Sequence, residues 1–333
     1  MKKLIFILMI FLIGCSNKTS IEPKPIVKKD EKLEIKDNLT FEYAEKISLY
    51  DLFKNSELII NENKLLDTDS LGNKKIEVNY KSNDENKKIT IEYKVSDTTI
   101  PFLNVSNLTT KVGNKINFLN KLTCGDNYDR EVKCEIIGDY DFNKVGTYDL
   151  KLKATDSSGN ENEKNFKLYV VEKSGSSTSK PKYYFDDLIK NHKTDKTMVG
   201  IDVSVWQGNI NFEKVKNAGC EFVMIRIGYG YDKNKQIVFD TKFKNNLINA
   251  KKAGLKVGLY FYSYAKSNKE AIEQAKWVIK ALDGETLDLP IAFDWEIWNG
   301  FSNYHINFKD LNDIATSFIN EINNAGYEGV IYS

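Results

Sequence analysis

The first half of the chain alternates apolar and polar residues and has little helical periodicity. Residues 75–80 and 88–95 each place β-branched and aromatic side chains on one face, and a polar, turn-forming stretch separates them. Such period-two runs predict half-buried strands, joined here as a hairpin. The pattern returns at residues 148–154 and 166–171, so the sequence predicts two related β-modules of about 70 residues each.

The pattern changes after residue 197, where short apolar runs alternate with segments of helical periodicity. Five runs predict strands, at residues 199–204, 222–227, 257–262, 289–293 and 329–332. Four segments between them predict helices, at residues 211–218, 240–252, 269–282 and 308–324. This alternation predicts an α/β domain with a parallel sheet, and successive right-handed crossovers favour a (β/α) TIM-like barrel. Because a barrel of that type has eight strands, we expect one that is incomplete at the C-terminus, in a fragment or a truncated chain.

The N-terminus has the pattern of an export signal. Lys2 and Lys3 precede an apolar run at residues 4–13, which is shorter than the ~20 residues that a membrane-spanning helix needs. The residues up to Cys15 resemble the bacterial lipobox, whose cysteine receives a diacylglyceryl group. We therefore expect an exported lipoprotein, anchored in the membrane at the bacterial cell surface through Cys15. The alternative is an ordinary secretory signal with an incidental cysteine.

These patterns divide the chain into six segments. The expected boundaries are a signal peptide at 1–14, a lipidated cysteine and tether at 15–32, β-modules at 33–96 and 97–172, a flexible linker at 173–196, and the α/β domain at 197–333.

Composition narrows the chemistry. A formal net charge of +1 gives no reason to expect a nucleic-acid partner. The two histidines are far apart in sequence and the cysteines form no Cys-x-x-Cys pair, so we expect no zinc site, no histidine-based metal site and no histidine-based catalysis. The chemistry is expected to depend on carboxylates. Cys124 and Cys134 are candidates for a disulfide in the second β-module, which the sequence leaves open because a bridge needs close Cα atoms.

Three acidic residues lie where predicted strands end. Asp202 closes the first strand of the α/β domain, and Asp294 and Glu296 close the fourth. Alternate residues of a strand face the same way, so both acids are predicted to face the barrel mouth, with Trp295 turned away. Clustered carboxylates repel each other, which raises at least one pKa and suits a general acid in glycoside hydrolysis. Nearby aromatic residues are candidates for stacking on sugar rings: Trp206, Tyr229, Tyr260, Tyr262 and Trp298.

The second β-module resembles the bacterial immunoglobulin-like modules of surface proteins. The resemblance rests on residues 97–101, 145–148 and 154–160, and the first module matches more loosely. It implies two small all-β immunoglobulin-like sandwiches ahead of the α/β domain. We expect these modules to act as spacers, with glycan or protein binding as the alternative.

Four stretches of the α/β domain resemble glycoside hydrolase family 25, the lysozymes of bacteria and phages: residues 200–208, 222–230, 253–263 and 289–296. The resemblance covers residues 198–333. It implies a muramidase that cleaves the β-1,4 bond between N-acetylmuramic acid and N-acetylglucosamine in peptidoglycan glycan strands, without a metal or cofactor.

The resemblance also implies roles for individual residues. Glu296 would be the general acid, and Asp294 would stabilise the substrate's acetamido group or the cationic transition state, with the N-acetyl oxygen as nucleophile. Asp202 would hydrogen-bond the sugar, while Tyr260 and Tyr262 would line the subsite. Two rivals stay open: a non-catalytic surface lipoprotein with a degenerate, glycan-binding hydrolase domain, and a chitinase-like barrel glycosidase, which residues 202–208 disfavour.

Overall fold

The computed structural model describes residues 32–172, 184–230, 236–298 and 301–332. The expected signal peptide, Cys15 and nearly all of the expected tether lie outside these residues. The chain divides into two compact units: the first comprises Met1–Leu39, Ser48–Leu65 and Lys75–Glu92, and the second comprises Thr40–Ile47, Leu66–Lys74 and Tyr93–Ser333. None of the helices in the described part of the chain is both long and apolar enough to cross a membrane.

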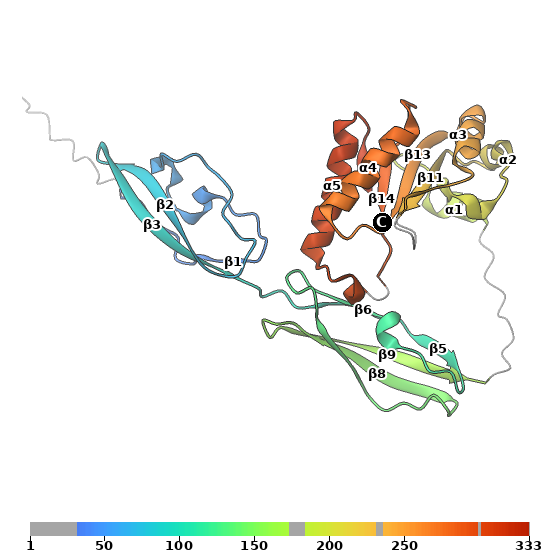
Figure 1. Ribbon diagram of the computed structural model, residues 1–333, viewed down its shortest axis with the longest axis horizontal. Coiled ribbons are helices and arrows are strands. Elements are labelled where there is room, and N and C mark those ends of the chain that lie inside the picture. Colours follow the sequence, from blue (N-terminus) through green and yellow to red (C-terminus); the bar gives the residue numbers. More distant parts are fainter. Residues whose placement is uncertain (1–31, 173–183, 231–235, 299–300, 333) are drawn as a thin grey trace, which may run out of the picture. The chain divides into compact units, whose positions relative to one another are not determined.

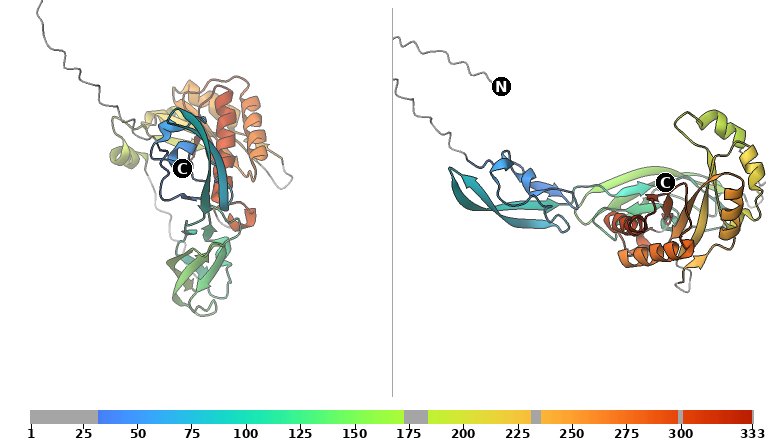
Figure 2. Two further views of the ribbon diagram at one scale, coloured as in Figure 1. Left: turned by 90° about the vertical axis from the view of Figure 1, so that its left-hand side faces the viewer. Right: turned by 90° about the horizontal axis from the view of Figure 1, so that it is seen from above.

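The first β-module contains the predicted hairpin. Its elements are β1 (Thr40–Glu42), η1 (Leu49–Leu52), η2 (Ser56–Leu58), β2 (Gly72–Ser82) and β3 (Glu85–Ser96). The strands form one sheet in the order β1-β3-β2, and β1 runs parallel to the end of β3. Figures 1 and 2 show β2 and β3 as a long, twisted pair. Val78 of β2 and Ile91 of β3 are buried, as the alternating pattern predicts for one face, and Leu49 of η1 is buried too.

The second β-module repeats this order of elements. Its elements are β4 (Phe102–Asn104), β5 (Leu108–Lys111), η3 (Phe118–Asn120), β6 (Thr123–Gly125), β7 (Lys133–Ile137), β8 (Gly146–Thr155) and β9 (Glu161–Val171). A four-stranded sheet, β5-β9-β8-β7, accompanies a two-stranded sheet, β4-β6. As in the first module, a short strand lies parallel to the last strand and a 3-10 turn precedes a long hairpin. The immunoglobulin-like assignment of both modules stays a prediction.

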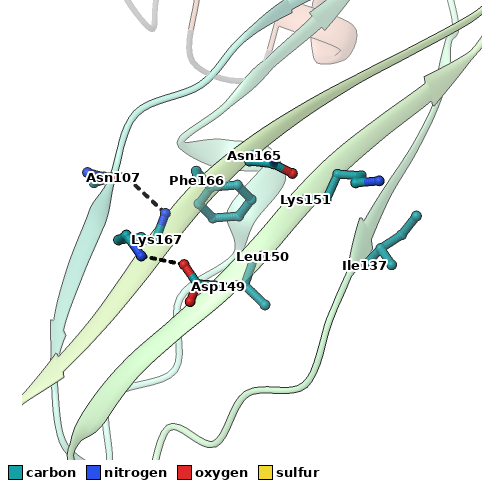
Figure 3. Close-up of a pocket in the computed structure, with 8 residues that line it drawn as sticks. All are labelled: Asn107, Ile137, Asp149, Leu150, Lys151, Asn165, Phe166 and Lys167. Atoms are coloured by element: carbon teal, nitrogen blue, oxygen red, sulfur yellow. Dashed lines mark hydrogen bonds and ion pairs between the residues drawn. The ribbon is translucent and has the colours of Figure 1, made fainter.

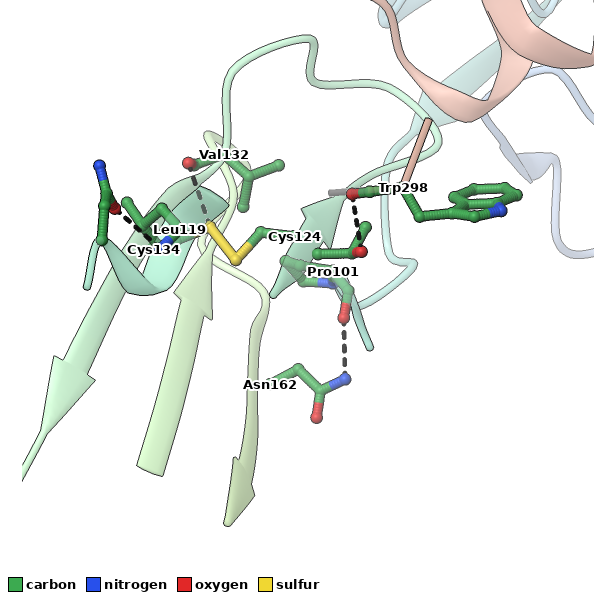
Figure 4. Close-up of a disulfide and its surroundings, with 9 residues drawn as sticks. Pro101, Leu119, Cys124, Val132, Cys134, Asn162 and Trp298 are labelled. Atoms are coloured by element: carbon green, nitrogen blue, oxygen red, sulfur yellow. Dashed lines mark hydrogen bonds between the residues drawn. A yellow bond between two sulfur atoms is a disulfide. The ribbon is translucent and has the colours of Figure 1, made fainter. Parts of the chain in front are cut away.

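A disulfide joins Cys124 in β6 to Cys134 in β7, and Figure 4 shows it linking the two sheets of the second module. The Cα atoms of the two cysteines are 6.5 Å apart, within the range that a disulfide bridges. Both cysteines pack with the core of this module, around Leu103, Leu152 and Leu168.

The α/β domain is built on a parallel sheet whose strands are neighbours in the order in which they occur along the chain. The strands are β10 (Gly200–Val203), β11 (Phe222–Gly230), β13 (Lys256–Ser263), β14 (Ile291–Asp294) and β15 (Gly329–Ile331). A short strand, β12 (Val238–Phe239), pairs antiparallel with β11. Singly wound parallel strands in this order are consistent with the predicted barrel-like domain.

Helices follow the strands as predicted: α2 (Phe212–Asn217), α3 (Phe243–Lys252), α4 (Asn268–Leu282) and α5 (Phe308–Asn324). Figure 1 shows α4 and α5 side by side, and they contact each other. Their apolar stripes bury Val278 and Phe318 against strand residues such as Phe261 and Phe293. Helix ends are specified locally: Ser267 caps α4 by accepting from the backbone of Glu270, and Asn307 forms a capping box with Asp310 on α5.

The second half of the expected linker is not a linker. Residues 173–183 lie outside the described part, but Phe185–His192 forms helix α1. Phe185 packs against the core of the α/β domain, and Lys193 forms an ion pair with Glu221. The serine and glycine content of the first half suggested flexibility for the whole segment, whereas the apolar residues of α1 attach its second half to the domain.

Candidate active site

Asp294 is buried at the end of a central strand. It is the last residue of β14, pairs in register with Tyr262 of β13, and is 4% exposed. Its Oδ1 atom has no hydrogen-bond partner among the described residues. Burial, and then the charges of Glu296 and Asp202, raise the pKa of Asp294 to about 7, although Arg226 acts in the opposite direction.

Glu296 lies two residues beyond Asp294 and is exposed. We predicted both acids on one strand; this is wrong, because β14 ends at Asp294. Trp295 between them is buried, and its ring meets those of Trp298 and Phe301 edge-on, with centroids 5.2 Å and 5.8 Å away. The backbone between the two acids is thus held by the packing of Trp295 and not by hydrogen bonds to a neighbouring strand.

Asp202 reaches the same region from the first strand. It lies within β10, which ends at Val203, one residue before the end of the predicted strand at 199–204. Asp202 is exposed, and its charge acts on Asp294, on Tyr260 of β13 and on Tyr332. The charge of Glu296 also acts on Asp294 and Tyr332. The structure therefore brings the three predicted acids together at the carboxyl ends of parallel strands.

Two of the predicted aromatic residues, Tyr260 and Tyr262, face this group of acids from β13. Burial, as the largest cause, raises the pKa of each to about 12. Both hydroxyls therefore keep their protons at neutral pH and can donate hydrogen bonds to sugar oxygens. Tyr332, which the sequence did not single out, lies 5.8 Å from Tyr260 between ring centroids.

The other predicted aromatic residues lie in different settings. Trp206 follows β10 in a 3-10 turn, η4 (Val205–Gln207), and is 83% exposed. Tyr229 lies near the end of β11, with the guanidinium of Arg226 5.5 Å from its ring centroid. Trp298 stacks on Phe301, and its carbonyl accepts a hydrogen bond from Thr123 at 2.8 Å. The exposed ring of Trp206 is thus available to stack on a ligand, whereas the ring of Trp298 already packs against Phe301.

A buried ion pair between Arg226 and Asp240 lies close to the site, where the charge of Arg226 acts on Asp294. Nε and Nη2 of Arg226 both donate to Oδ2 of Asp240 at 2.9 Å. Asp240 is 2% exposed and also accepts from the backbone N–H groups of Val205 and Lys242. Arg226 was not predicted as a site residue, although one signal was visible: it is a lone basic residue inside the apolar run at 222–227.

Residues 201–333 match the family model of glycosyl hydrolases family 25. The match begins in β10 and includes Asp202, Asp294 and Glu296. An autolytic lysozyme of Clostridium acetobutylicum is 29% identical over 136 residues, which are 41% of this chain and 38% of that protein. Lysozyme M1 of Streptomyces globisporus is 41% identical over 64 residues, which are 19% of this chain and 20% of that protein. The matched part thus spans less than half the length of these curated relatives.

Solved structures also show similarity to part of this chain. A family 25 glycosyl hydrolase of Bacillus anthracis is 21% identical with a TM-score of 0.36, over 42% of this chain and 63% of that chain. The modular autolysin LytC of Streptococcus pneumoniae, solved with a synthetic peptidoglycan ligand, is 21% identical with a TM-score of 0.37, over 55% of this chain and 42% of that chain. The matches with the family model and the curated relatives support a family 25 hydrolase domain in residues 201–333.

A hollow on the second β-module lies outside this family 25 domain. Figure 3 shows it along β8 and β9, with Asp149 and Lys167 forming an ion pair at its edge. The side chain of Asn107 accepts from the backbone N–H of Lys167 at 2.9 Å. Because these polar groups satisfy one another, the hollow offers no convergent chemistry comparable to that of the three acids.

The raised pKa of Asp294 makes the stability of the family 25 domain depend on pH. Its pKa is about 7 in the folded chain and ordinarily 3.8, so between these values the folded state binds more protons than the unfolded state. The free energy of unfolding should therefore fall as pH rises from about 4 to about 7. Asp294→Asn should reduce this slope and stabilise the chain on the order of 2 kcal/mol at pH 8.

Thermal unfolding measured from pH 4 to pH 8 tests this prediction. The control is Asp195→Asn, which changes an exposed carboxyl in the same unit. A pH slope that is the same in Asp294→Asn as in the unchanged chain would contradict the assignment of the burial penalty to Asp294.

Proposed function

We propose that the α/β domain hydrolyses the β-1,4 bond between N-acetylmuramic acid and N-acetylglucosamine in peptidoglycan. The observation that carries the proposal is the convergence of Asp202, Asp294 and Glu296 at the carboxyl ends of parallel strands, within the segment that matches family 25. Such strand ends are where barrels of this type gather their catalytic groups.

Glu296 is proposed as the general acid because it is the exposed member of the close pair. It gives its proton to the glycosidic oxygen as the bond from that oxygen to C1 of the muramic sugar breaks. The substrate's N-acetyl oxygen bonds to C1 and forms a cyclic cation. Water then attacks C1 and gives a proton back to Glu296, which restores the general acid. This attack breaks the bond between C1 and the N-acetyl oxygen, so the cyclic cation opens and C1 keeps its original configuration.

Asp294 is proposed to stabilise the positive charge that develops on the sugar. At neutral pH it is only about half ionised, since its pKa is about 7. A cationic transition state beside it favours the ionised carboxylate, so the interaction is stronger in the transition state than in the ground state. Tyr260 and Tyr262 are proposed to donate hydrogen bonds to the sugar, and the exposed Asp202 to accept one.

The same proposal locates the chain at the bacterial cell surface. A lipid on Cys15 would hold it in the membrane, and the two β-modules would space the hydrolase domain from the anchor. The support is the sequence pattern around Cys15 and the repeated architecture of the modules. Mass spectrometry of the N-terminal peptide from the membrane fraction tests the anchor, and an unmodified Cys15 would contradict it.

The chemistry is tested by the identity of the new reducing end. The chain is incubated with purified peptidoglycan, and the products are reduced with borohydride before sugar analysis. Reduced muramic acid is the expected product. Reduced glucosamine would indicate a different glycosidase. If no reducing end appears, the muramidase proposal is contradicted, and the non-catalytic, glycan-binding interpretation is favoured.

A further inference from the structure

Three aspartates of the second unit occupy equivalent places in the fold. Asp97, Asp126 and Asp156 each directly follow the last residue of a strand: β3, β6 and β8 respectively. One carboxylate oxygen from each lies within 4.8 Å of the others. All three residues are buried, with exposed fractions of 6%, 1% and 7%. The fold therefore gathers three carboxylates, distant in sequence, away from solvent.

These carboxylates lack the partners that buried charges need. Neither oxygen of Asp97 has a hydrogen-bond partner of ordinary geometry among the described residues, although the nearby side chain of Ser158 lowers the pKa of Asp97, and Oδ2 of Asp126 has no partner among them either. The charges that act on Asp97 come from Asp126, Asp156 and Glu42, and all are negative. Burying unpaired charge of one sign is strongly unfavourable unless a cation neutralises it. Burial, and then the charge of Asp126, raise the pKa of Asp97 to about 6.

The remaining oxygens of the cluster are held in place by amide groups. Oδ1 of Asp126 accepts from the backbone N–H groups of Tyr128 and Asp129, at 2.8 Å and 2.9 Å. Asp156 accepts from the backbone and the side chain of Asn160, at 2.8 Å and 2.9 Å. Two of the three carboxylates are thus oriented by the protein, and the unpartnered oxygens of Asp97 complete the group.

We propose that Asp97, Asp126 and Asp156 bind one calcium ion. Calcium takes oxygen ligands at about 2.3–2.6 Å, which places two ligands on opposite sides of the ion up to about 5 Å apart. The 4.8 Å limit on the three oxygens fits this span. Magnesium, with ligands at about 2.0–2.1 Å, would need a tighter group, and zinc favours nitrogen or sulfur ligands. Oδ1 of Asn127 is also buried without a partner and is a candidate further ligand.

A calcium ion here would stabilise the loop that follows β6. Within the second unit this loop contacts the start of α5: the N–H of Phe308 donates to the carbonyl of Asp126 at 2.8 Å, and Asn307 donates to the carbonyl of Tyr128 at 2.6 Å. Arg130 pairs with Asp310 through both carboxylate oxygens. The ion would therefore order the side of the module that contacts the hydrolase domain.

The test measures calcium binding by the full chain after removal of metal with EGTA. Isothermal titration with calcium chloride should give one ion per chain, and millimolar calcium should raise the unfolding temperature by several degrees. Asp97→Asn should weaken calcium binding about tenfold or more, because affinity depends on the number of charged ligands. The matched control is Asp139→Asn, an exposed aspartate of the same module, which should bind as the unchanged chain does.

Two results would overturn the proposal. One is the absence of calcium binding by the unchanged chain, and the other is equal affinity in Asp97→Asn and Asp139→Asn. A misfolded variant is excluded by a second measurement. In EGTA, Asp97→Asn should unfold at a temperature no lower than the unchanged chain, because the repulsion is relieved and the amide oxygen can still accept from the nearby hydroxyl of Ser158. A lower unfolding temperature in EGTA would show that the carboxylates are not mutually repulsive and would also overturn the proposal.

Discussion

Glu296→Gln should lower the rate of peptidoglycan hydrolysis by about 10² to 10⁴-fold and leave glycan binding almost unchanged. The amide has nearly the shape of the acid but cannot give a proton to the leaving oxygen, and general acids contribute about this factor. Because Glu296 is exposed, folding should not suffer. The measurement is the release of reducing ends from peptidoglycan at a fixed enzyme concentration, with binding followed by sedimentation with the insoluble glycan.

The matched control is Glu213→Gln, which makes the same change at an exposed position of α2 in the same domain. It should retain full activity. If Glu296→Gln keeps more than about a tenth of the activity, the proton comes from another group, and Asp294 becomes the first candidate because of its raised pKa. Loss of binding together with activity would instead indicate that Glu296 holds the substrate.

Asp240→Ala should destabilise the family 25 domain by about 3–5 kcal/mol. The change leaves the guanidinium of Arg226 buried without its counter-charge and removes the acceptor for the backbone N–H groups of Val205 and Lys242. Breaking a buried pair from one side has a large effect because the remaining charge cannot reach water. Equilibrium unfolding in urea, followed by tryptophan fluorescence, measures the loss.

The control for this prediction is an ion pair between a basic and an acidic side chain at the surface. Glu285 forms an ion pair with Lys251 and is 42% exposed, so Glu285→Ala should cost less than about 1 kcal/mol. A double variant, Arg226→Met with Asp240→Leu, should recover much of the stability because neither charge remains. Equal losses in Asp240→Ala and Glu285→Ala would mean that the Arg226 charge is solvated despite its burial.

Periodicity in the sequence predicts the α/β domain well, because its signals are local. The four helices and five strands fall within a few residues of their predicted bounds, because neighbouring residues fix where they begin and end. Ser267 and Asn307 are N-caps at which α4 and α5 begin, and Gly254 follows the end of α3 with a positive φ. The acids Asp202, Asp294 and Glu296 were found because parallel strands must bring their carboxyl ends to one edge. This rule for parallel sheets placed Glu296 near the other two acids even though β14 ends at Asp294 and does not include Glu296.

Features that depend on pairing across the fold were not predictable from the sequence. Arg226 meets Asp240, which comes 14 residues later in the chain, and neither residue indicates the other by its spacing. The sequence also could not show which acid would have the raised pKa, because that depends on the burial of Asp294 and the exposure of Glu296. Asp97, Asp126 and Asp156 were not predicted as a site, because their proximity depends on how the ends of β3, β6 and β8 assemble.

The order of the parallel sheet has a consequence for how the hydrolase domain forms. Each of β11, β13, β14 and β15 pairs with the parallel strand of this sheet that comes before it in the chain. A chain that emerges from a ribosome or an export channel N-terminus first therefore always presents the next strand to a partner that is already available. Each connection is a crossover to the neighbouring strand of the sheet and never to a more distant one, which limits the loop-closure entropy at every step. The domain can therefore grow strand by strand during its own synthesis or export.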